Sequence, residues 1–357
     1  MCLRLWHISG KRDILISKEM IEKGEPMKIH FNTSALEPMI DWLMDRKRTG
    51  RGDEDRLREV LSHPDYQVEL LRYADPGMPV CGISLEEAVD FFMNFDAKDF
   101  ENPRLQYKKE SFRAFYDDLE NRCKSIGAFV SMAPEDYALM ETLLKNGLPD
   151  EMFDQIPELN VIFIVSIGNS MGWPYGHYID YDVANLTAFR NKADFVHLTA
   201  HEIHHVFTGP LLAPEGIRGE DFFLQNFAFE GLAVHYMNNL ATVDKRAKYD
   251  DCTYVMDERD MAFYEAHFDE IFDMIRNDYR ACIGRSLDEV KELVAGRYEQ
   301  FSFLGREIRQ YPTYYFGCYM WGLVDLVYGK EKVYEAIAKP ELFVPLYNAA
   351  AQEKYRL

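Results

Sequence analysis

The segment FVHLTAHEIHHVFTG, residues 195–209, gathers side chains that can bind a metal ion and move protons. His201 and His205 are four positions apart, which on a helix places both imidazoles on one face, with Cβ atoms about 5–6 Å apart. Glu202 directly follows the first histidine and can accept a proton from a metal-activated water without binding the metal itself. The HExxH pattern therefore predicts two ligands and one general base, with a single Zn²⁺ as the expected ion.

The third ligand must come from outside this segment. The continuation HExxHxxGxxH is excluded, because Thr208 and Leu211 stand where its glycine and histidine would be. The other common arrangement adds a glutamate from a later helix and leaves one position open for water. Glu230, 25 residues after His205, lies in the apolar stretch FAFEGLAVHY, where a carboxylate is costly unless it is paired or bound to metal. We therefore expect Glu230 to be the third ligand, with Gly231 allowing a neighbouring helix to approach closely.

Other polar side chains near the motif receive different interpretations. Three nearby acids are assigned to a loop or to the first turn of the following helix: Glu215, Glu220 and Asp221. His197 lies close to the ligand face, and a hydrogen bond to a backbone carbonyl is favoured over a supporting role at the metal. His204 is turned away from His205, and His235 lies off the face of Glu230, so neither is expected to be a ligand.

The elements that hold these residues can also be predicted. The apolar run LNVIFIVSIG from residue 159 indicates a buried strand, and HYIDYDV (177–183) indicates a partner that forms a hairpin with it across the turn residues GNSMGWPYG. A helix ending at Gly209 and Pro210 then carries the motif, and a second helix over 219–240 carries Glu230. A strand is expected over 27–31. Further helices are expected over 34–47, 84–95, 107–129, 134–147, 256–279, 286–295, 313–328, 331–338 and 341–354, with capping boxes at Ser34/Glu37, Ser84/Glu87 and Ser286/Glu289 and a charged loop over 48–55.

The fold class follows as α+β and predominantly helical, with a small sheet or hairpin packed on the motif helix. We expect three parts: a mostly helical region over 1–150, a catalytic core over 151–245 and a helical lobe over 246–357.

The residues HEIHH…FEGLA resemble the gluzincin group of zinc metallopeptidases and, more closely, uncharacterised families of zinc-dependent peptidases. The resemblance covers roughly residues 160–235 and implies a zincin-like core. It further implies that zinc is bound by His201, His205 and Glu230 and that Glu202 activates water. The GAMEN signature of common aminopeptidases is missing, because residues 168–172 read GNSMG.

A hydrogen-bond donor for the reaction's oxyanion is sought in RQYPTYYFGCYMWGLV (309–324), which loosely resembles the tyrosine-rich helix of helical oligopeptidases. Pro312 indicates the start of that helix. Tyr315 is the preferred donor, with Tyr314 and Tyr311 as alternatives and aromatic core packing as the competing role. An extended peptide is expected to pair with the edge of the strand over 159–167 or 177–183.

Composition limits the possible partners. The 357 residues carry a formal net charge of −20, which argues against binding nucleic acid or an anionic membrane surface. The six cysteines have no close ligand spacing, and the chain shows neither a signal-peptide core nor an apolar run long enough to span a bilayer. A cytoplasmic protein with reduced thiols and a peptide or protein substrate is expected, while the oligomeric state stays open.

Two other classes of protein share part of this pattern. Deformylases use HExxH with a cysteine as third ligand, but this chain has EGLA at the corresponding motif, so they or another amide hydrolase rank lower. A non-catalytic zinc-binding protein would close its site with a fourth ligand. That ligand would be His197, His204 or His235, and helical phase disfavours all three.

Overall fold

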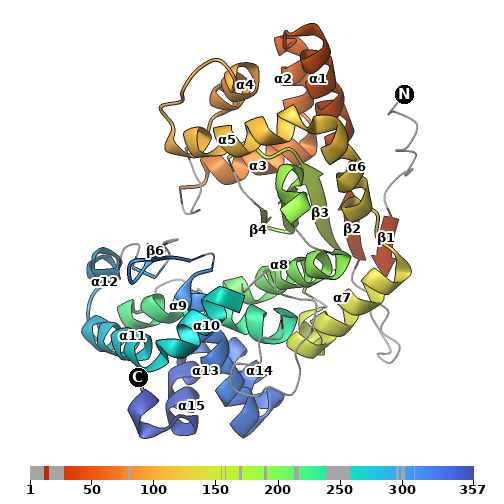
Figure 1. The fold of residues 1–357 in the computed structure, drawn as a ribbon. Helices are drawn as coiled ribbons and strands as arrows, with labels where there is room; N and C mark the ends of the chain where they lie inside the picture. Colours follow the sequence, from red (N-terminus) through yellow and green to blue (C-terminus); the bar gives the residue numbers. More distant parts are fainter. Residues whose placement is uncertain are drawn as a thin grey trace. The chain divides into compact units, whose positions relative to one another are not determined.

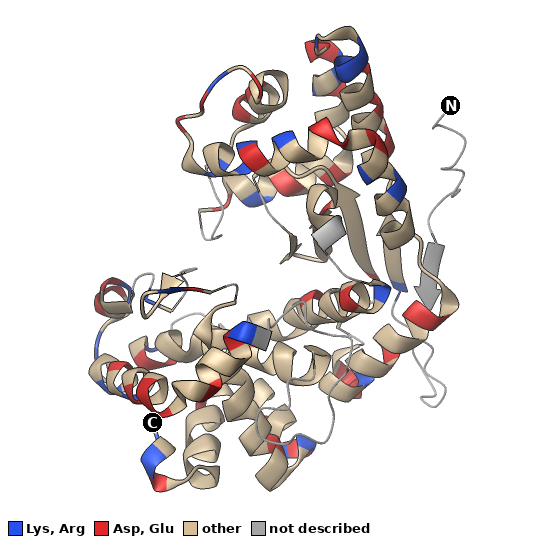
Figure 2. Ribbon diagram, in the orientation of Figure 1, with Lys and Arg blue, Asp and Glu red and all other residues tan. Residues whose placement is uncertain are grey.

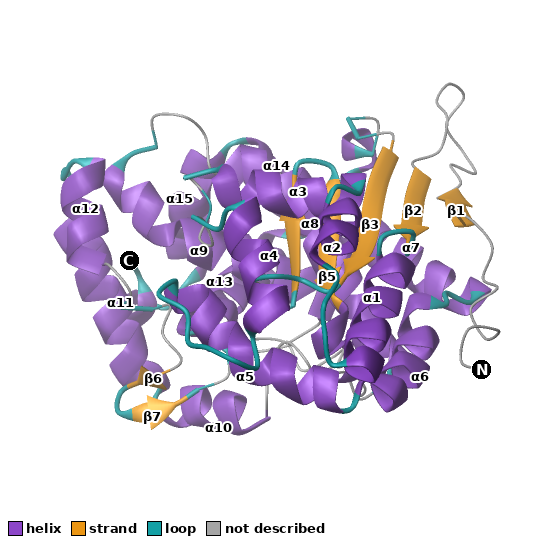
Figure 3. Ribbon diagram, turned by 90° about the horizontal axis from the view of Figure 1, so that it is seen from above, coloured by secondary structure: helices purple, strands orange, loops and turns teal. Residues whose placement is uncertain are grey.

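The computed structural model describes residues 12–15, 28–76, 78, 82–153, 155–156, 158–168, 171–188, 191–212, 217–238, 258–294, 297–298, 302–308 and 310–357. It is predominantly helical with a small mixed sheet, which confirms the α+β class (Figures 1 and 3). Two compact units are formed: unit 1 contains Met1–Tyr137 and Phe153–Lys192, and unit 2 contains Ala138–Met152 and Ala193–Leu357. The three-part division expected from the sequence stays a prediction.

The sheet of unit 1 has five strands in the order β1-β2-β3-β5-β4. Their bounds are β1 Arg12–Leu15, β2 Lys28–Asn32, β3 Glu158–Ile164, β4 Gly172–Tyr175 and β5 Tyr178–Asp182. The strands β2, β3 and β5 run parallel, whereas β1 pairs antiparallel with β2 and β4 antiparallel with β5. From Val161 to Ile164 every residue of β3 is fully buried, which explains its continuous apolar sequence.

Two expectations about this sheet were wrong. The strands β3 and β5 are neighbours but parallel, and the hairpin partner of β5 is β4, which lies inside the segment interpreted as a turn. The tight turn between β4 and β5 contains Gly176, whose φ of 57° favours glycine. Because β3 and β5 both lie inside the sheet, neither offers a free edge to a peptide.

Four helices of unit 1 lie in segments predicted to be helical, whereas no helix was predicted for residues 54–74. The helices are α1 Leu36–Thr49, α2 Glu54–Leu61, α3 Pro64–Ala74, α4 Leu85–Asn94, α5 Pro103–Asp117 and α6 Leu119–Val130. The capping box at Ser84 and Glu87 is confirmed. The box at Ser34 is wrong, because α1 begins after Ala35 without a side-chain cap. The helix expected over 107–129 is interrupted at Asp118, and α2 begins within the expected loop, capped by the Asp53 side chain.

Unit 2 contains most of α7 (Pro134–Gly147) and the helices that follow the sheet. These are α8 Lys192–Leu212, α9 Gly219–Ala233, α10 Glu258–Ala266, α11 Phe268–Cys282, α12 Leu287–Val294, α13 Pro312–Tyr328, α14 Lys330–Ala338 and α15 Phe343–Ala350, with a short hairpin of β6 (Ser302–Phe303) and β7 (Arg306–Glu307). The capping box at Ser286 and Glu289 is present at α12. The helix expected over 256–279 breaks at His267, and α8 continues past Gly209 to Leu212. After Ala233 the chain forms a π turn, η3 (Val234–Asn238), instead of more α-helix.

The helices α9 and α13 cross at two glycines. A Cβ atom added to Gly231 would lie 2.1 Å from the carbonyl carbon of Gly317, so any larger side chain would force the helices apart. One turn further along, the Trp321 indole donates a hydrogen bond of 2.9 Å to the carbonyl oxygen of Ala228. The expectation that Gly231 permits a close helix approach is confirmed.

Charged residues are present throughout the described chain. Lysine, arginine and carboxylate residues occur on helices of both units (Figure 2). Among the described residues, no helix combines the length and apolar character needed to cross a bilayer. Cys123, Cys282 and Cys318 are buried.

Candidate metal centre

The two histidines of the motif project from a buried stretch of α8. His201 and His205 are only 2% and 4% exposed, and their ring centroids lie 4.4 Å apart with the planes at 83°. Both side chains lie on the same face of the helix because four residues make slightly more than one turn. The i, i+4 spacing in the sequence therefore does place two imidazoles side by side.

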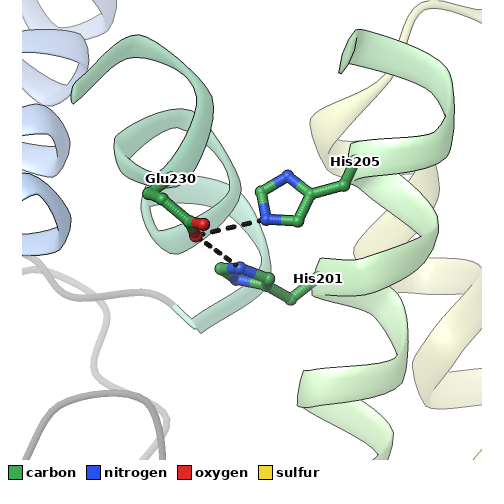
Figure 4. Close-up of side chains that lie close together, drawn as sticks. All are labelled: His201, His205 and Glu230. Carbon is green, nitrogen blue, oxygen red and sulfur yellow. Dashed lines mark hydrogen bonds and ion pairs between the residues drawn. The ribbon is translucent and has the colours of Figure 1, made fainter. Parts of the chain in front are cut away.

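Glu230 of α9 completes the cluster. Its Oε2 lies 3.1 Å from Nε2 of His201 and 3.2 Å from Nε2 of His205 (Figure 4). Among the described residues this is the one group of three or more metal-binding side chains, and its ligand atoms all lie within 4.8 Å of one another. Ligands about 2.0–2.1 Å from a tetrahedral zinc ion would be about 3.3 Å apart, so the spacing fits zinc.

The charges in the cluster favour an ionised Glu230. Burial alone would raise the pKa of Glu230, but the two histidines outweigh it and hold that pKa well below its ordinary value. Burial alone would lower the pKa of His201, whereas Glu230 and Glu202 together raise it. Burial lowers the pKa of His205, and Glu230 offsets this only in part. The site therefore carries an ionised carboxylate beside two buried imidazoles.

The hydrogen bonds of His201 also fit a role as a metal ligand. Nδ1 of His201 lies 2.8 Å from Oδ1 of Asn238, and because that oxygen can only accept, Nδ1 carries the proton. A second proton on Nε2 would be needed to hydrogen-bond Glu230, and that would make His201 a buried imidazolium. A metal ion satisfies the same geometry with a neutral imidazole, whose Nε2 lone pair binds the ion.

Glu202 lies next to the cluster without belonging to its ligand set. The side chain is 8% exposed, and its charge raises the pKa of both His201 and Tyr314. This closeness to a predicted ligand and to a phenol is what a proton-transferring carboxylate needs.

Of the candidate tyrosines, the structure brings Tyr314 to the cluster. Its ring is stacked over His201, with centroids 6.2 Å apart and planes at 9°. Burial, the charges of Glu230 and Glu202, and a hydrogen bond to Glu230 raise the pKa of Tyr314 well above its ordinary value. Tyr315, the preferred residue from the sequence, instead packs against Tyr264, Phe268 and Phe316, because one residue along a helix turns a side chain by about 100°.

The three other histidines near the motif have neighbours outside the cluster. Nδ1 of His197 is hydrogen-bonded to the backbone carbonyl of Met237, as favoured from the sequence. His204 is fully buried beside Thr208, and His235 pairs with Asp325 of α13 at 2.9 Å. The described residues thus give no fourth protein ligand near the cluster.

Two neighbours of the cluster escaped the sequence interpretation. The ring of Phe229 is stacked on His205, with centroids 3.7 Å apart and planes at 9°. Asn238 reaches His201 only because α9 changes into the π turn η3. A buried asparagine eight residues after Glu230 was the available signal, but an uninterrupted helix would have placed it elsewhere.

Comparison with known proteins gives one match. The model of a family described as "Putative zinc dependent peptidase (DUF5700)" matches residues 97–355, which is more than half of the chain. The matched range includes α8, α9 and α13 and therefore every residue of the cluster. No curated protein and no solved structure matches the chain.

Proposed function

We propose that the chain, which belongs to the family described as "Putative zinc dependent peptidase (DUF5700)", hydrolyses peptide bonds at one zinc ion held by His201, His205 and Glu230. The observation that carries this proposal is the convergence of the three ligand atoms within 4.8 Å, with Glu202 beside them. The ligand set is of the gluzincin type, and the motif helix followed by a glutamate-bearing helix is the basis for proposing a zincin-like core.

Each side chain then has a chemical role. When bound, zinc supplies a Lewis acid that polarises the peptide carbonyl and lowers the pKa of water. Glu202 takes the proton from the attacking water and delivers it to the leaving amine. Its position directly after the first ligand in the sequence keeps this carboxylate beside the reacting atoms.

Tyr314 takes the role first assigned to Tyr315. A phenol whose pKa is raised keeps its proton at neutral pH and can donate a hydrogen bond to a developing oxyanion. The ring stacked on His201 holds this donor at the edge of the cluster.

The donor count supports catalysis over a closed structural site. Structural zinc sites use four protein ligands, whereas the described residues supply three and leave a position for water or substrate. Glu230 occupies the third position that a cysteine takes in deformylases, which favours a peptidase over that alternative.

Metal analysis combined with peptide-library cleavage tests the proposal. Wild type is expected to hold about one zinc per chain and to cleave peptides, whereas Glu230→Ala loses most of both. Glu220→Ala, which changes an acid in the first turn of the same helix, is the matched control and retains both. Equal zinc content in wild type and Glu230→Ala would remove Glu230 from the site.

A further inference from the structure

We propose that the π turn η3 fixes His201 in the tautomer that binds metal, with Asn238 as the positioning residue. This inference rests on the proposed zinc site and adds to it the element that controls its affinity. Five residues, Val234–Asn238, form the turn directly after α9. Single π turns inside or at the end of α-helices occur often at functional sites, because they redirect the residues that follow.

The turn presents two hydrogen-bond acceptors to α8. The carbonyl oxygen of Met237 accepts from Nδ1 of His197, and the side-chain oxygen of Asn238 accepts from Nδ1 of His201 at 2.8 Å. His197 and His201 are one helical turn apart, so two consecutive residues of η3 contact two consecutive rings on one face of α8. Since both acceptors lack a proton, each ring keeps its proton on Nδ1.

The proton on Nδ1 of His201 determines which ring nitrogen can bind a metal ion. With Nδ1 protonated, Nε2 carries the lone pair, and Nε2 is the atom that lies 3.1 Å from Glu230. Asn238 thus fixes both the tautomer and the rotation of the ring before a metal ion arrives. Loss of such an outer hydrogen bond typically costs about 10–100-fold in metal affinity.

The second ligand is held in a different way. Within the part of the chain that the structure describes, Nδ1 of His205 is buried without a hydrogen-bond partner. Its ring is oriented by stacking on Phe229. Of the two histidines, His201 is therefore the one oriented by a hydrogen bond, and that bond comes from Asn238 of η3.

The turn itself is held from two sides. A Cβ atom added to Gly147, at the end of α7, would lie 2.1 Å from Cε of Met237 and 2.9 Å from Cβ of Tyr236. On the other side His235 pairs with Asp325 of α13. A turn fixed by two helices can impose a fixed position on Asn238.

Two substitutions of similar volume test the role of the Asn238 oxygen. Asn238→Leu removes the acceptor, whereas Asn238→Asp keeps an oxygen in the same place. Competition with a chromophoric chelator is expected to show zinc bound about 10–100-fold more weakly by Asn238→Leu and nearly as tightly by Asn238→Asp. Asn348→Leu, the same change in α15, is the control and should bind zinc as wild type does.

The outcomes separate this inference from the metal site itself. Wild-type affinity in Asn238→Leu, or equal weakening by the leucine and aspartate variants, overturns the role of Asn238. Wild-type affinity in His201→Ala overturns the zinc site. Should Asn238→Leu not fold, ¹⁵N-histidine NMR of the zinc-loaded wild type decides the matter: His201 is expected to be protonated at Nδ1 and bound through Nε2, and binding through Nδ1 would refute the proposal.

Discussion

The ring of Tyr314 lies parallel to the imidazole of His201, with 6.2 Å between their centroids. Tyr315, the next residue of α13, instead packs against the rings of Tyr264, Phe268 and Phe316. A difference of one residue along the helix thus separates a phenol beside His201 from a phenol in the core.

Removal of the Tyr314 hydroxyl should slow catalysis even when the site is saturated with zinc. At saturating zinc, Tyr314→Phe is expected to lower kcat about 10²–10³-fold, as loss of an oxyanion donor does. Tyr315→Phe is the control and should keep the wild-type kcat. A larger loss of kcat in Tyr315→Phe than in Tyr314→Phe would reverse the assignment.

Neutralising Glu202 should separate metal binding from chemistry. Glu202→Gln is expected to keep zinc and to lose about 10²–10⁴-fold in kcat, because the amide cannot accept the proton from water. Glu230→Gln should instead weaken zinc binding and activity together. The check is metal analysis beside peptide-cleavage kinetics, and full activity of Glu202→Gln would disprove its role as base.

The crossing of α9 and α13 should tolerate no methyl group. Alanine in place of a helical glycine usually stabilises by about 0.5–1 kcal/mol, but a Cβ on Gly317 would lie 2.0 Å from the carbonyl oxygen of Phe227. Gly231→Ala and Gly317→Ala are each expected to lower the free energy of unfolding by about 1–3 kcal/mol.

Because both glycines belong to one contact, the double variant should lose less than the sum of the single changes. Thermal unfolding of the four proteins measures this. Additive losses would show that the two glycines act independently.

Stability should fall as pH rises through the range in which Glu69 ionises. This fully buried residue of unit 1 has a pKa raised to about 7, chiefly by burial, and its Oε1 accepts hydrogen bonds from Tyr73 and the backbone of Ile167. The folded state binds the proton more tightly than the unfolded chain, whose carboxyl has a pKa of about 4.3. The contribution of Glu69 to the free energy of unfolding is therefore fully present below about pH 4, and it is lost as pH rises towards 7.

Urea denaturation between pH 4.5 and 8 checks this slope. Glu69→Gln should show a weaker fall in unfolding free energy over that range, while the exposed Glu37→Gln behaves like wild type. Burial and the charge of Glu69 also raise the pKa of Asp180, so this residue is expected to contribute to the slope that remains. An unchanged slope in Glu69→Gln would contradict the prediction.

Local patterns accounted for much of the site. The spacing of His201 and His205 depends only on helical geometry, and Glu230 was identifiable as an acid in an apolar helix. Their convergence could therefore be expected, as could the strand β3 and the boundaries of α13.

Features decided by contacts between distant segments could not be predicted in this way. The parallel pairing of β3 with β5 depends on β4 completing the hairpin, and apolar patterning does not distinguish parallel from antiparallel neighbours. The π turn after Ala233 differs from an α-helix by a small change in hydrogen bonding, and Gly147 and Asp325 help to hold it from elsewhere in the chain. The choice between Tyr314 and Tyr315 required the rotation of α13 against α9.

The contact of Gly147 with Met237 and Tyr236 limits how this protein can be divided. Unit 2 is discontinuous, because Ala138–Met152 belongs to it although it precedes the last strands of unit 1. A fragment beginning at Ala193 would contain HExxH, Glu230 and Tyr314 but would leave the π turn without the residue packed against it. During synthesis, the ribosome releases α7 long before the residues it supports, so unit 2 becomes complete only when an early segment meets a late one.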